Sequence, residues 1–290
     1  MIKKVSLLGP EFTYTDFAAD AFLRGKKAKV NSLTKGIEAK VYRDTIEEVM
    51  LDVEKGRAAV GVVPIENRLH GTVRCTLDGL FIHRVQIIAE LTLPIKHCIS
   101  VLPGAKPADI KIIMSHDQAL HQCHECLKKN FPKCDRVAVS SSAKAFETVK
   151  IKDFRHIAVI GPEEAAKKHG FKIIKKDIAD EIDNSTKFIV IAKRCMRKRV
   201  PDSPLTKKPN TTSIAFYFSR DKSGSLFTVF KAFADNSVNM TKIESRPYKA
   251  DYGNYLFFID FEGHPAQKNV ETTLKEVDSL VAGLKILGIY

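Results

Sequence analysis

The chain has 290 residues, of which 44% are hydrophobic and 28% are charged, a composition typical of a soluble globular protein with about two domains. No stretch is apolar for long enough to span a membrane as a helix, so we expect no membrane partner. The first residues lead straight into a strand pattern without a signal region, and the six cysteines follow no disulfide framework. These features predict a cytoplasmic protein with reduced thiols.

The formal net charge of +13 raises the question of nucleic acid, because clustered Lys and Arg side chains bind phosphates. Here the basic residues are scattered, and the densest run, 193–199, lies before several prolines, as in an exposed linker. The chain has no Trp and no aromatic series beside that run, so we expect no nucleic-acid partner. A basic surface that attracts small anionic substrates is the favoured interpretation.

A strand that runs into hydroxyl residues or Gly-Pro and then into a helix recurs four times in the first part of the chain. The strands are expected at 4–8, 110–114, 136–139 and 157–160, and the junctions after them at 9–16, 115–118, 140–142 and 161–163. This alternation predicts an α/β architecture, whose ligands bind beyond the carboxyl ends of the strands. Several helix N-termini around one cleft would suit a ligand with more than one carboxylate.

Two further stretches indicate a domain with two lobes. The apolar run 61–65 reads as a strand that ends in Glu66 and Asn67, and the Asn67 amide offers both donors and an acceptor. The long run 86–101 alternates around Pro94 and predicts one or two strands that cross into a second lobe. We therefore expect a cleft between two lobes.

Polar residues at 183–187 stand directly before the apolar run Phe188 to Ala192, which reads as a buried strand. Groups at such a strand end can point into a cleft from a rigid base, so Thr186 is the catalytic candidate. Alternatively, Asn184 and Ser185 only form a turn and Thr186 starts the strand.

A cluster of His and Cys residues between 116 and 134 contains a C-x-x-C sequence and suggests zinc. However, Leu120, Cys123, Cys126 and Leu127 fall on one helical face, which is typical of small core residues, and no second C-x-x-C supplies further ligands. We therefore expect no metal.

After a linker that contains prolines, the pattern from 211 onward is strand, helix, strand, strand, helix, strand. This βαββαβ order predicts a ferredoxin-like sandwich. We expect the exposed edge or face of its sheet to pair with a copy from another subunit, which would give a homodimer or homotetramer.

Motifs in the same order along nearly the whole chain resemble the prephenate dehydratase family with a carboxy-terminal ACT regulatory domain. Before the ACT part, the family motifs G-P-x-G-T-F-T, V-P-I-E-N-S-x-x-G, T-L-D-L-L, S-H-P-Q-A-L-x-Q-C and N-x-T-R-F are matched by residues 9–15, 63–71, 76–80, 115–123 and 184–188. The E-S-R-P signature of the ACT part is matched at 244–247, after a loop with glycine at 224–226. The resemblance implies a catalytic domain at 1–195, a linker at 196–210 and an ACT domain at 211–290.

The resemblance implies two α/β lobes like those of periplasmic binding proteins, and conversion of prephenate to phenylpyruvate in phenylalanine biosynthesis without metal or cofactor. Thr186 would be the principal donor to the leaving ring hydroxyl, with Asn67 and Gln118 as catalytic partners. The implied substrate-binding residues are Thr13, Glu66, Arg68, Ser115, Ser141, Lys187 and Phe188. For Glu66, a structural or orienting role is as open as proton transfer.

The resemblance also implies feedback regulation by L-phenylalanine, bound where the ACT domains of two subunits meet. The residues expected at this effector site are Gly224, Leu226, Asn239, Glu244, Ser245 and Arg246. Arg246 could instead serve only as a structural tether.

Three positions depart from the family pattern. Lys187 replaces an arginine and loses its two-pronged grip on a carboxylate, Arg68 replaces a serine, and Phe12 replaces a glycine at a turn. Arg68 either compensates for the arginine missing at 187 or points to solvent. These departures leave open an arogenate dehydratase or a catalytically weakened, amino-acid-sensing homologue.

Overall fold

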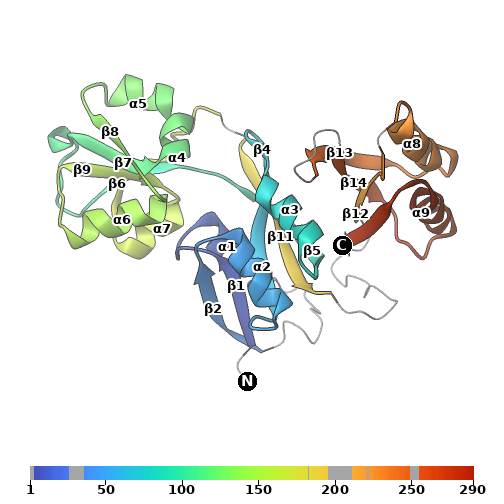
Figure 1. Cartoon of the computed structure of the whole chain (residues 1–290). Helices are drawn as coiled ribbons and strands as arrows, with labels where there is room; N and C mark the ends of the chain where they lie inside the picture. The colour runs from blue at the N-terminus through green and yellow to red at the C-terminus, as the bar shows by residue number, and fades with distance from the viewer. Residues whose placement is uncertain (1–2, 26–35, 182, 195–210, 221, 249–254) are drawn as a thin grey trace.

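The computed structural model describes residues 3–25, 36–181, 183–194, 211–220, 222–248 and 255–290. Two α/β lobes and a C-terminal sandwich lie in a row, with the first lobe in the middle (Figure 1). The two-lobed α/β domain and the C-terminal sandwich that we predict from the sequence are confirmed. The linker expected at 196–210 lies outside the described residues.

Lobe 1 is built on a mixed sheet in which β2, β1 and β3 are parallel and β11 runs antiparallel between β3 and β5. Its strands are β1 (Lys3–Leu8), β2 (Ile37–Arg43), β3 (Val60–Asn67), β4 (Gly71–Thr72), β5 (Val85–Pro94) and β11 (Ser185–Lys193). Its helices are α1 (Tyr14–Arg24), α2 (Ile46–Glu54) and α3 (Arg74–Ile82). The apolar run expected at 188–192 forms the buried part of β11, and β11 begins at Ser185, so Thr186 lies within the strand.

Lobe 2 has a five-stranded sheet in the order β10-β6-β9-β7-β8. Its strands are β6 (Cys98–Val101), β7 (Ile112–His116), β8 (Asp135–Val139), β9 (Ile157–Gly161) and β10 (Lys172–Lys175). Its helices are η1 (Pro107–Asp109), α4 (Asp117–Gln122), α5 (His124–Asn130), α6 (Ser142–Ile151) and α7 (Glu163–His169). The run predicted at 86–101 is divided between β5 in lobe 1 and β6 in lobe 2, so this segment crosses between the lobes as expected.

The helical face that carries the cysteines is interrupted at Cys123, which lies between α4 and α5. Cys123 is fully buried in the core of lobe 2, and partly buried Cys126 and Cys134 pack against the same core. Burial raises the pKa of the Cys123 thiol. Among the described residues, no group of three or more His, Cys, Asp or Glu side chains is arranged to hold a metal ion. The described part of the chain also has no helix that is long and apolar enough to cross a membrane.

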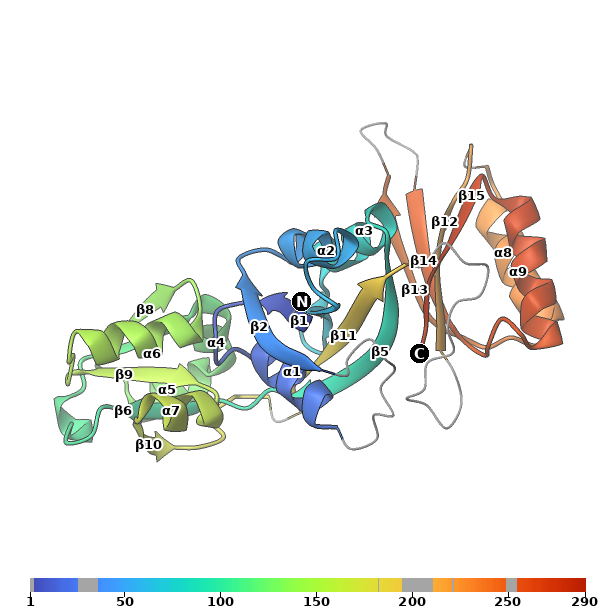
Figure 2. The same cartoon turned by 90° about the horizontal axis from the view of Figure 1, so that it is seen from below.

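The C-terminal domain has the predicted βαββαβ order and a sheet in the order β13-β14-β12-β15. Its elements are β12 (Thr211–Tyr217), α8 (Ser225–Asp235), β13 (Met240–Pro247), β14 (Tyr255–Glu262), α9 (Lys268–Leu280) and β15 (Gly283–Ile289). Both helices lie on the face of this sheet that points away from lobe 1 (Figure 2). They cover an apolar core that includes Phe216, Phe233 and Phe261.

The other face of this sheet is covered by lobe 1 of the same chain, which corrects the expectation that it is open to another subunit. Phe258 and Leu287 of the C-terminal sheet share one buried core with Leu80 and Ile87 of lobe 1. In addition, β15 pairs with β5 through Gly288 and Ile87, so the two sheets form one continuous sheet. Because apolar surface is buried on both faces of its sheet, the C-terminal domain is packed firmly against lobe 1.

The contact between β15 and β5 requires a glycine at position 288. A Cβ atom placed there would lie 2.5 Å from the backbone oxygen of Ile87, and backbone atoms cannot move aside cheaply. We expect Gly288→Ala to lower the free energy of unfolding by about 1 to 3 kcal/mol, the usual cost of overpacking. Chemical denaturation measures this change.

Gly25→Ala is the matched control, because a Cβ atom at Gly25 would meet its nearest neighbours at an ordinary 3.4 Å. If Gly288→Ala is as stable as this control, the two sheets do not pair through residue 288.

Candidate active site

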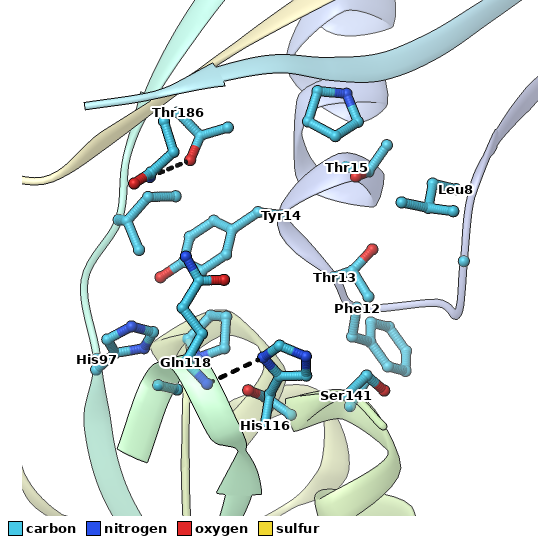
Figure 3. Close-up of a pocket in the computed structure, with 18 of the residues that line it drawn as sticks. Leu8, Phe12, Thr13, Tyr14, Thr15, His97, His116, Gln118, Ser141 and Thr186 are labelled. Carbon is cyan, nitrogen blue, oxygen red and sulfur yellow. Dashed lines mark hydrogen bonds between the residues drawn. The ribbon is translucent and has the colours of Figure 1, made fainter. Parts of the chain in front are cut away.

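A cavity of about 320 Å³ lies between the two lobes (Figure 3). Its walls come from the turn after β1, the ends of β3 and β11, the crossing segment around His97, and the first turns of helices in lobe 2. Six of the residues predicted for the site line it: Thr13, Asn67, Gln118, Ser141, Thr186 and Phe188.

The N-termini of four helices converge on this cavity, as the four strand-to-helix junctions predict. Thr13 caps α1, His116 caps α4, Ser141 caps α6 and Pro162 precedes α7, and all four residues line the cavity. The Ser141 hydroxyl accepts a hydrogen bond from the Lys144 N–H at 3.0 Å. Helix N-termini favour negative charge because their first N–H groups lack partners within the helix.

No Lys, Arg, Asp or Glu is found among the described residues that line the cavity. An anion held there would therefore be bound by hydroxyls, amides, imidazoles and helix dipoles. Such donors attract an anion without a Lys or Arg counter-ion.

The side chain of Asn67 fixes the orientation of Thr186. The Oδ1 atom of Asn67 accepts hydrogen bonds from the backbone N–H groups of Leu69 and His70, both at 3.1 Å. Because a backbone N–H can only donate, the amide nitrogen of Asn67 must point the other way, where it donates to Thr186 Oγ1 at 2.9 Å. The same nitrogen lies 2.9 Å from Asn184 Oδ1 and 3.1 Å from the Ser185 backbone oxygen.

This bond decides what the Thr186 hydroxyl can do. Its oxygen accepts from Asn67, so its own proton is directed away from Asn67 and can be donated toward the cavity that the side chain lines. Figure 3 shows Thr186 on one wall, with Gln118 and His116 rising from the opposite lobe. The arrangement provides a preorganised donor in a site built from both lobes.

The match to family models and the curated relatives show the family of this chain. Residues 5–196 match the family model of prephenate dehydratase, and residues 213–279 match that of the ACT domain. The chain belongs to the prephenate dehydratase family.

Curated relatives of the family resemble the chain over nearly its whole length. The prephenate dehydratase of Methanocaldococcus jannaschii is 35% identical over 291 residues, which cover 100% of this chain and 98% of that protein. The bifunctional chorismate mutase/prephenate dehydratase of Aquifex aeolicus is 37% identical over 288 residues, 99% of this chain and 73% of the relative. A solved prephenate dehydratase from Arthrobacter aurescens in complex with L-Phe has a TM-score of 0.84 and 27% identity, over 99% of this chain and 89% of that one.

Two residues of this prephenate dehydratase homologue that the sequence did not point to also line the cavity, Tyr14 and His97. Burial lowers the pKa of His97, and its Nε2 lies 2.9 Å from Gln122 Oε1. The Tyr14 hydroxyl accepts from the Lys96 N–H at 2.9 Å and donates to the Lys96 oxygen at 2.5 Å. In the sequence, the available signal for His97 was its place in the segment predicted to cross between the lobes. The signal for Tyr14 was its place in the junction predicted at 9–16.

Four residues predicted to bind substrate lie outside the cavity wall in the structure. Ser115 is fully buried beneath it and donates to the Ile160 oxygen at 2.7 Å. Glu66 points to the ACT domain, where the Lys242 amine lies 2.7 Å from its carboxylate. Both side chains thus support neighbouring elements.

The two basic residues at departures from the family pattern are also engaged elsewhere. The Lys187 amine pairs with Glu90 at 3.2 Å, and the exposed Arg68 side chain donates to the Asp183 oxygen at 3.2 Å. The structure therefore does not bring Arg68 and Lys187 together on one carboxylate site.

The third departure, Phe12, adopts the conformation for which the family glycine is suited. Its φ of 66° lies in the left-handed region, and its N–H donates to the buried Asp16 carboxylate at 2.9 Å. Its ring meets the His169 ring of lobe 2 edge-on, with centroids 5.0 Å apart. Phe12 thus pays a backbone cost and gains a contact between the lobes.

This balance predicts an order of stability for two substitutions. Phe12→Ala loses the ring contact and keeps a Cβ atom at positive φ, whereas Phe12→Gly loses the ring and removes the strain. We expect the glycine variant to be more stable than the alanine variant by about 1 kcal/mol. Urea denaturation of both variants tests this order, and a more stable alanine variant would show that φ is not positive in solution.

The residues expected at the effector site are distributed over the helix side and the edge strand of the ACT domain. Gly224 has a φ of 86° and is the N-cap residue directly before α8, Leu226 is partly buried against the core beneath α8, and Asn239 is exposed just before β13. On β13, Ser245 is exposed, whereas Glu244 accepts from Thr72 and Arg246 pairs with Asp78 of lobe 1 at 2.9 Å. Arg246 therefore has the tethering contact that the sequence left open.

Proposed function

We propose that the protein converts prephenate to phenylpyruvate, with loss of carbon dioxide and water, in the biosynthesis of phenylalanine. The observation that carries the proposal is the Thr186 hydroxyl, oriented by Asn67 toward a cavity ringed by four helix N-termini. Family membership supports the same reaction.

The reaction needs one proton and no outside oxidant or reductant. The ring carboxylate leaves as carbon dioxide, the electrons of that C–C bond complete the aromatic ring, and the C–O bond to the ring hydroxyl breaks. The departing hydroxyl takes up a proton and becomes water. Thr186 would donate a hydrogen bond or proton to this oxygen, and such help is typically worth about 10² to 10⁴ in rate.

A threonine hydroxyl is a weak acid, so its neighbours must share the stabilisation of the leaving oxygen. The Asn67 donor polarises the Thr186 oxygen, and the Gln118 side chain reaches across the cavity from α4. Donors that are already in place when charge develops stabilise the transition state without reorganisation.

The two carboxylates of prephenate would be held by the helix N-termini of both lobes. Thr13 and Ser141 supply hydroxyls at two of these ends, with Phe188 packed beneath the site. Because one carboxylate can contact lobe 1 and the other lobe 2, the substrate would hold the lobes together.

For regulation, we propose L-phenylalanine as the effector, bound at the ACT domain near Gly224, Leu226, Asn239 and Ser245. The ACT match and the phenylalanine complex of the Arthrobacter aurescens enzyme support this assignment. The exposed edge strand β13 is a suitable pairing surface for a second subunit, and we propose a homodimer or homotetramer.

We also propose a cytoplasmic location, because the five cysteines that the structure describes are all free thiols.

The direct test is phenylpyruvate formation from prephenate by the purified protein, followed spectrophotometrically with and without phenylalanine. Arogenate, the amino analogue, is assayed in parallel. Turnover of prephenate supports the proposal, whereas turnover of arogenate alone assigns the other substrate, and no turnover of either one leaves an amino-acid sensor.

Thr186→Val keeps the shape of the side chain and removes its hydroxyl. We expect kcat to fall by about 10² to 10⁴ with little change in KM, because the lost interaction is needed chiefly in the transition state. Steady-state kinetics measures both constants. A variant with near wild-type kcat would remove Thr186 from the mechanism.

Asn67→Asp changes one donor into an acceptor at almost constant volume. One carboxylate oxygen would keep the bonds from Leu69 and His70, and the other would accept the Thr186 proton and so withdraw that donor from the cavity. We expect kcat to fall by at least about a hundredfold, the usual effect of losing one such donor. Equal kcat in variant and wild type would show that Asn67 does not orient Thr186.

A further inference from the structure

The hairpin formed by the end of β3 and by β4 contacts three parts of the molecule. Asn67 donates to Thr186 in the cavity wall. His70 at its tip lies 3.0 Å from Gln122 of lobe 2. Its two strands, through Glu66 and Thr72, contact the ACT domain.

The ACT residues that reach this hairpin come from one side of β13. Lys242, Glu244 and Arg246 alternate along the strand and are partly buried against lobe 1, whereas Ile243 and Ser245 between them are exposed. Lys242 and Glu244 contact the hairpin, and Arg246 contacts α3 instead. β13 therefore grips lobe 1 at two separate places.

Lys242 contacts Glu66, the residue directly before Asn67. Its amine lies 2.7 Å from Glu66 Oε2 and 3.3 Å from Thr72 Oγ1, so it joins the two strands of the hairpin. Its side chain is only 22% exposed. Partial burial acts to raise the pKa of Glu66, but the hydrogen bond and positive charge of Lys242 outweigh it, and the pKa lies below its usual value.

Glu66 is followed directly by Asn67, and both residues face β11. Asn67 is opposite Thr186 and Glu66 is opposite Lys187, next to an irregularity in the register between Lys187 and Phe188. Because the ladder is irregular here, strand pairing alone holds this end of β3 less firmly. The contact between Lys242 and Glu66 can therefore help to fix its position.

We infer that Lys242 of the ACT domain is a positioning residue for the reaction: by holding Glu66, it sets the place of the Asn67 amide and hence the direction of the Thr186 hydroxyl. The inference rests on the proposed function. Lys242 is not among the described residues that line the cavity. It therefore acts through Glu66 and Asn67 and does not touch substrate. The ACT domain would then contribute to basal turnover as well as to regulation.

The test is a set of point variants in the full chain, because deletion of the ACT domain would expose the core that it shares with lobe 1. Lys242→Gln breaks the ion pair, Lys242→Arg keeps it, and Glu66→Gln breaks it from the other side if the first variant does not fold. The matched control is Asp78→Asn, which breaks the other described ion pair between β13 and lobe 1 at a distance from Asn67.

We expect Lys242→Gln to lower kcat by at least about tenfold, as displaced catalytic groups do, with KM for prephenate within about twofold of wild type. Lys242→Arg should restore most of kcat, and Asp78→Asn should leave it within about twofold of wild type. If Lys242→Gln lowers kcat no more than Asp78→Asn does, or if it changes only KM, Lys242 is not a positioning residue.

A crystal structure of the Lys242→Gln variant separates this inference from the proposed function. The bond between Asn67 Nδ2 and Thr186 Oγ1, 2.9 Å in the wild-type chain, should be lengthened or broken. An unchanged bond overturns the inference whatever the activity. Absence of prephenate turnover by the wild-type protein overturns the proposed function, and the structure of the variant still decides whether Lys242 places Asn67.

Discussion

The hydrogen bonds of the Asn67 side chain hold together the part of the molecule on which the proposed chemistry depends. Backbone N–H groups of the hairpin fix the amide oxygen, and the amide nitrogen then binds Thr186 on the neighbouring strand and Asn184 just before it. An amide is suited to this place because it offers an acceptor to one side and donors to the other. The strand that carries Asn67 also supplies Val60 and Val62 to the core of lobe 1.

The distribution of charge explains how a basic protein can bind a dianion without a cation in its cavity. The net charge of +13 favours the approach of an anion over a long range, whereas the described cavity wall has no Lys or Arg and offers hydroxyls, amides, imidazoles and helix N-termini. Neutral donors avoid the cost of burying a lysine or arginine when the site is empty. The pairing of Lys187 with Glu90 outside the wall is consistent with this division.

Much of the fold and part of the site could be predicted because the signals are local. Apolar runs and strand-to-helix junctions mark the elements, and Thr13, Ser141 and Thr186 stand at such junctions or strand ends. His97 was missed because it reaches the cavity through the path of the crossing segment, which depends on how two lobes pack, and Tyr14 stands in the junction predicted at 9–16 without being singled out there. Glu66 and Arg246 sit in local motifs, but their partners lie 168 or more residues away in the chain, and sequence spacing cannot reveal such contacts.

The largest difference from the sequence-based expectation is the covered face of the ACT sheet, and it changes how regulation can work. A domain joined by a flexible linker could influence the cleft only through the arrangement of subunits, whereas a domain that shares a core and a sheet with lobe 1 is coupled to it directly. The strand β13 has Lys242 on the side that faces the hairpin of β3 and β4, and Ser245 on the exposed side, where the effector is proposed to bind. A ligand that binds more tightly to one position of this strand therefore shifts the equilibrium between the positions of the hairpin formed by β3 and β4. The size of the shift equals the difference in binding free energy, typically about 1 to 3 kcal/mol.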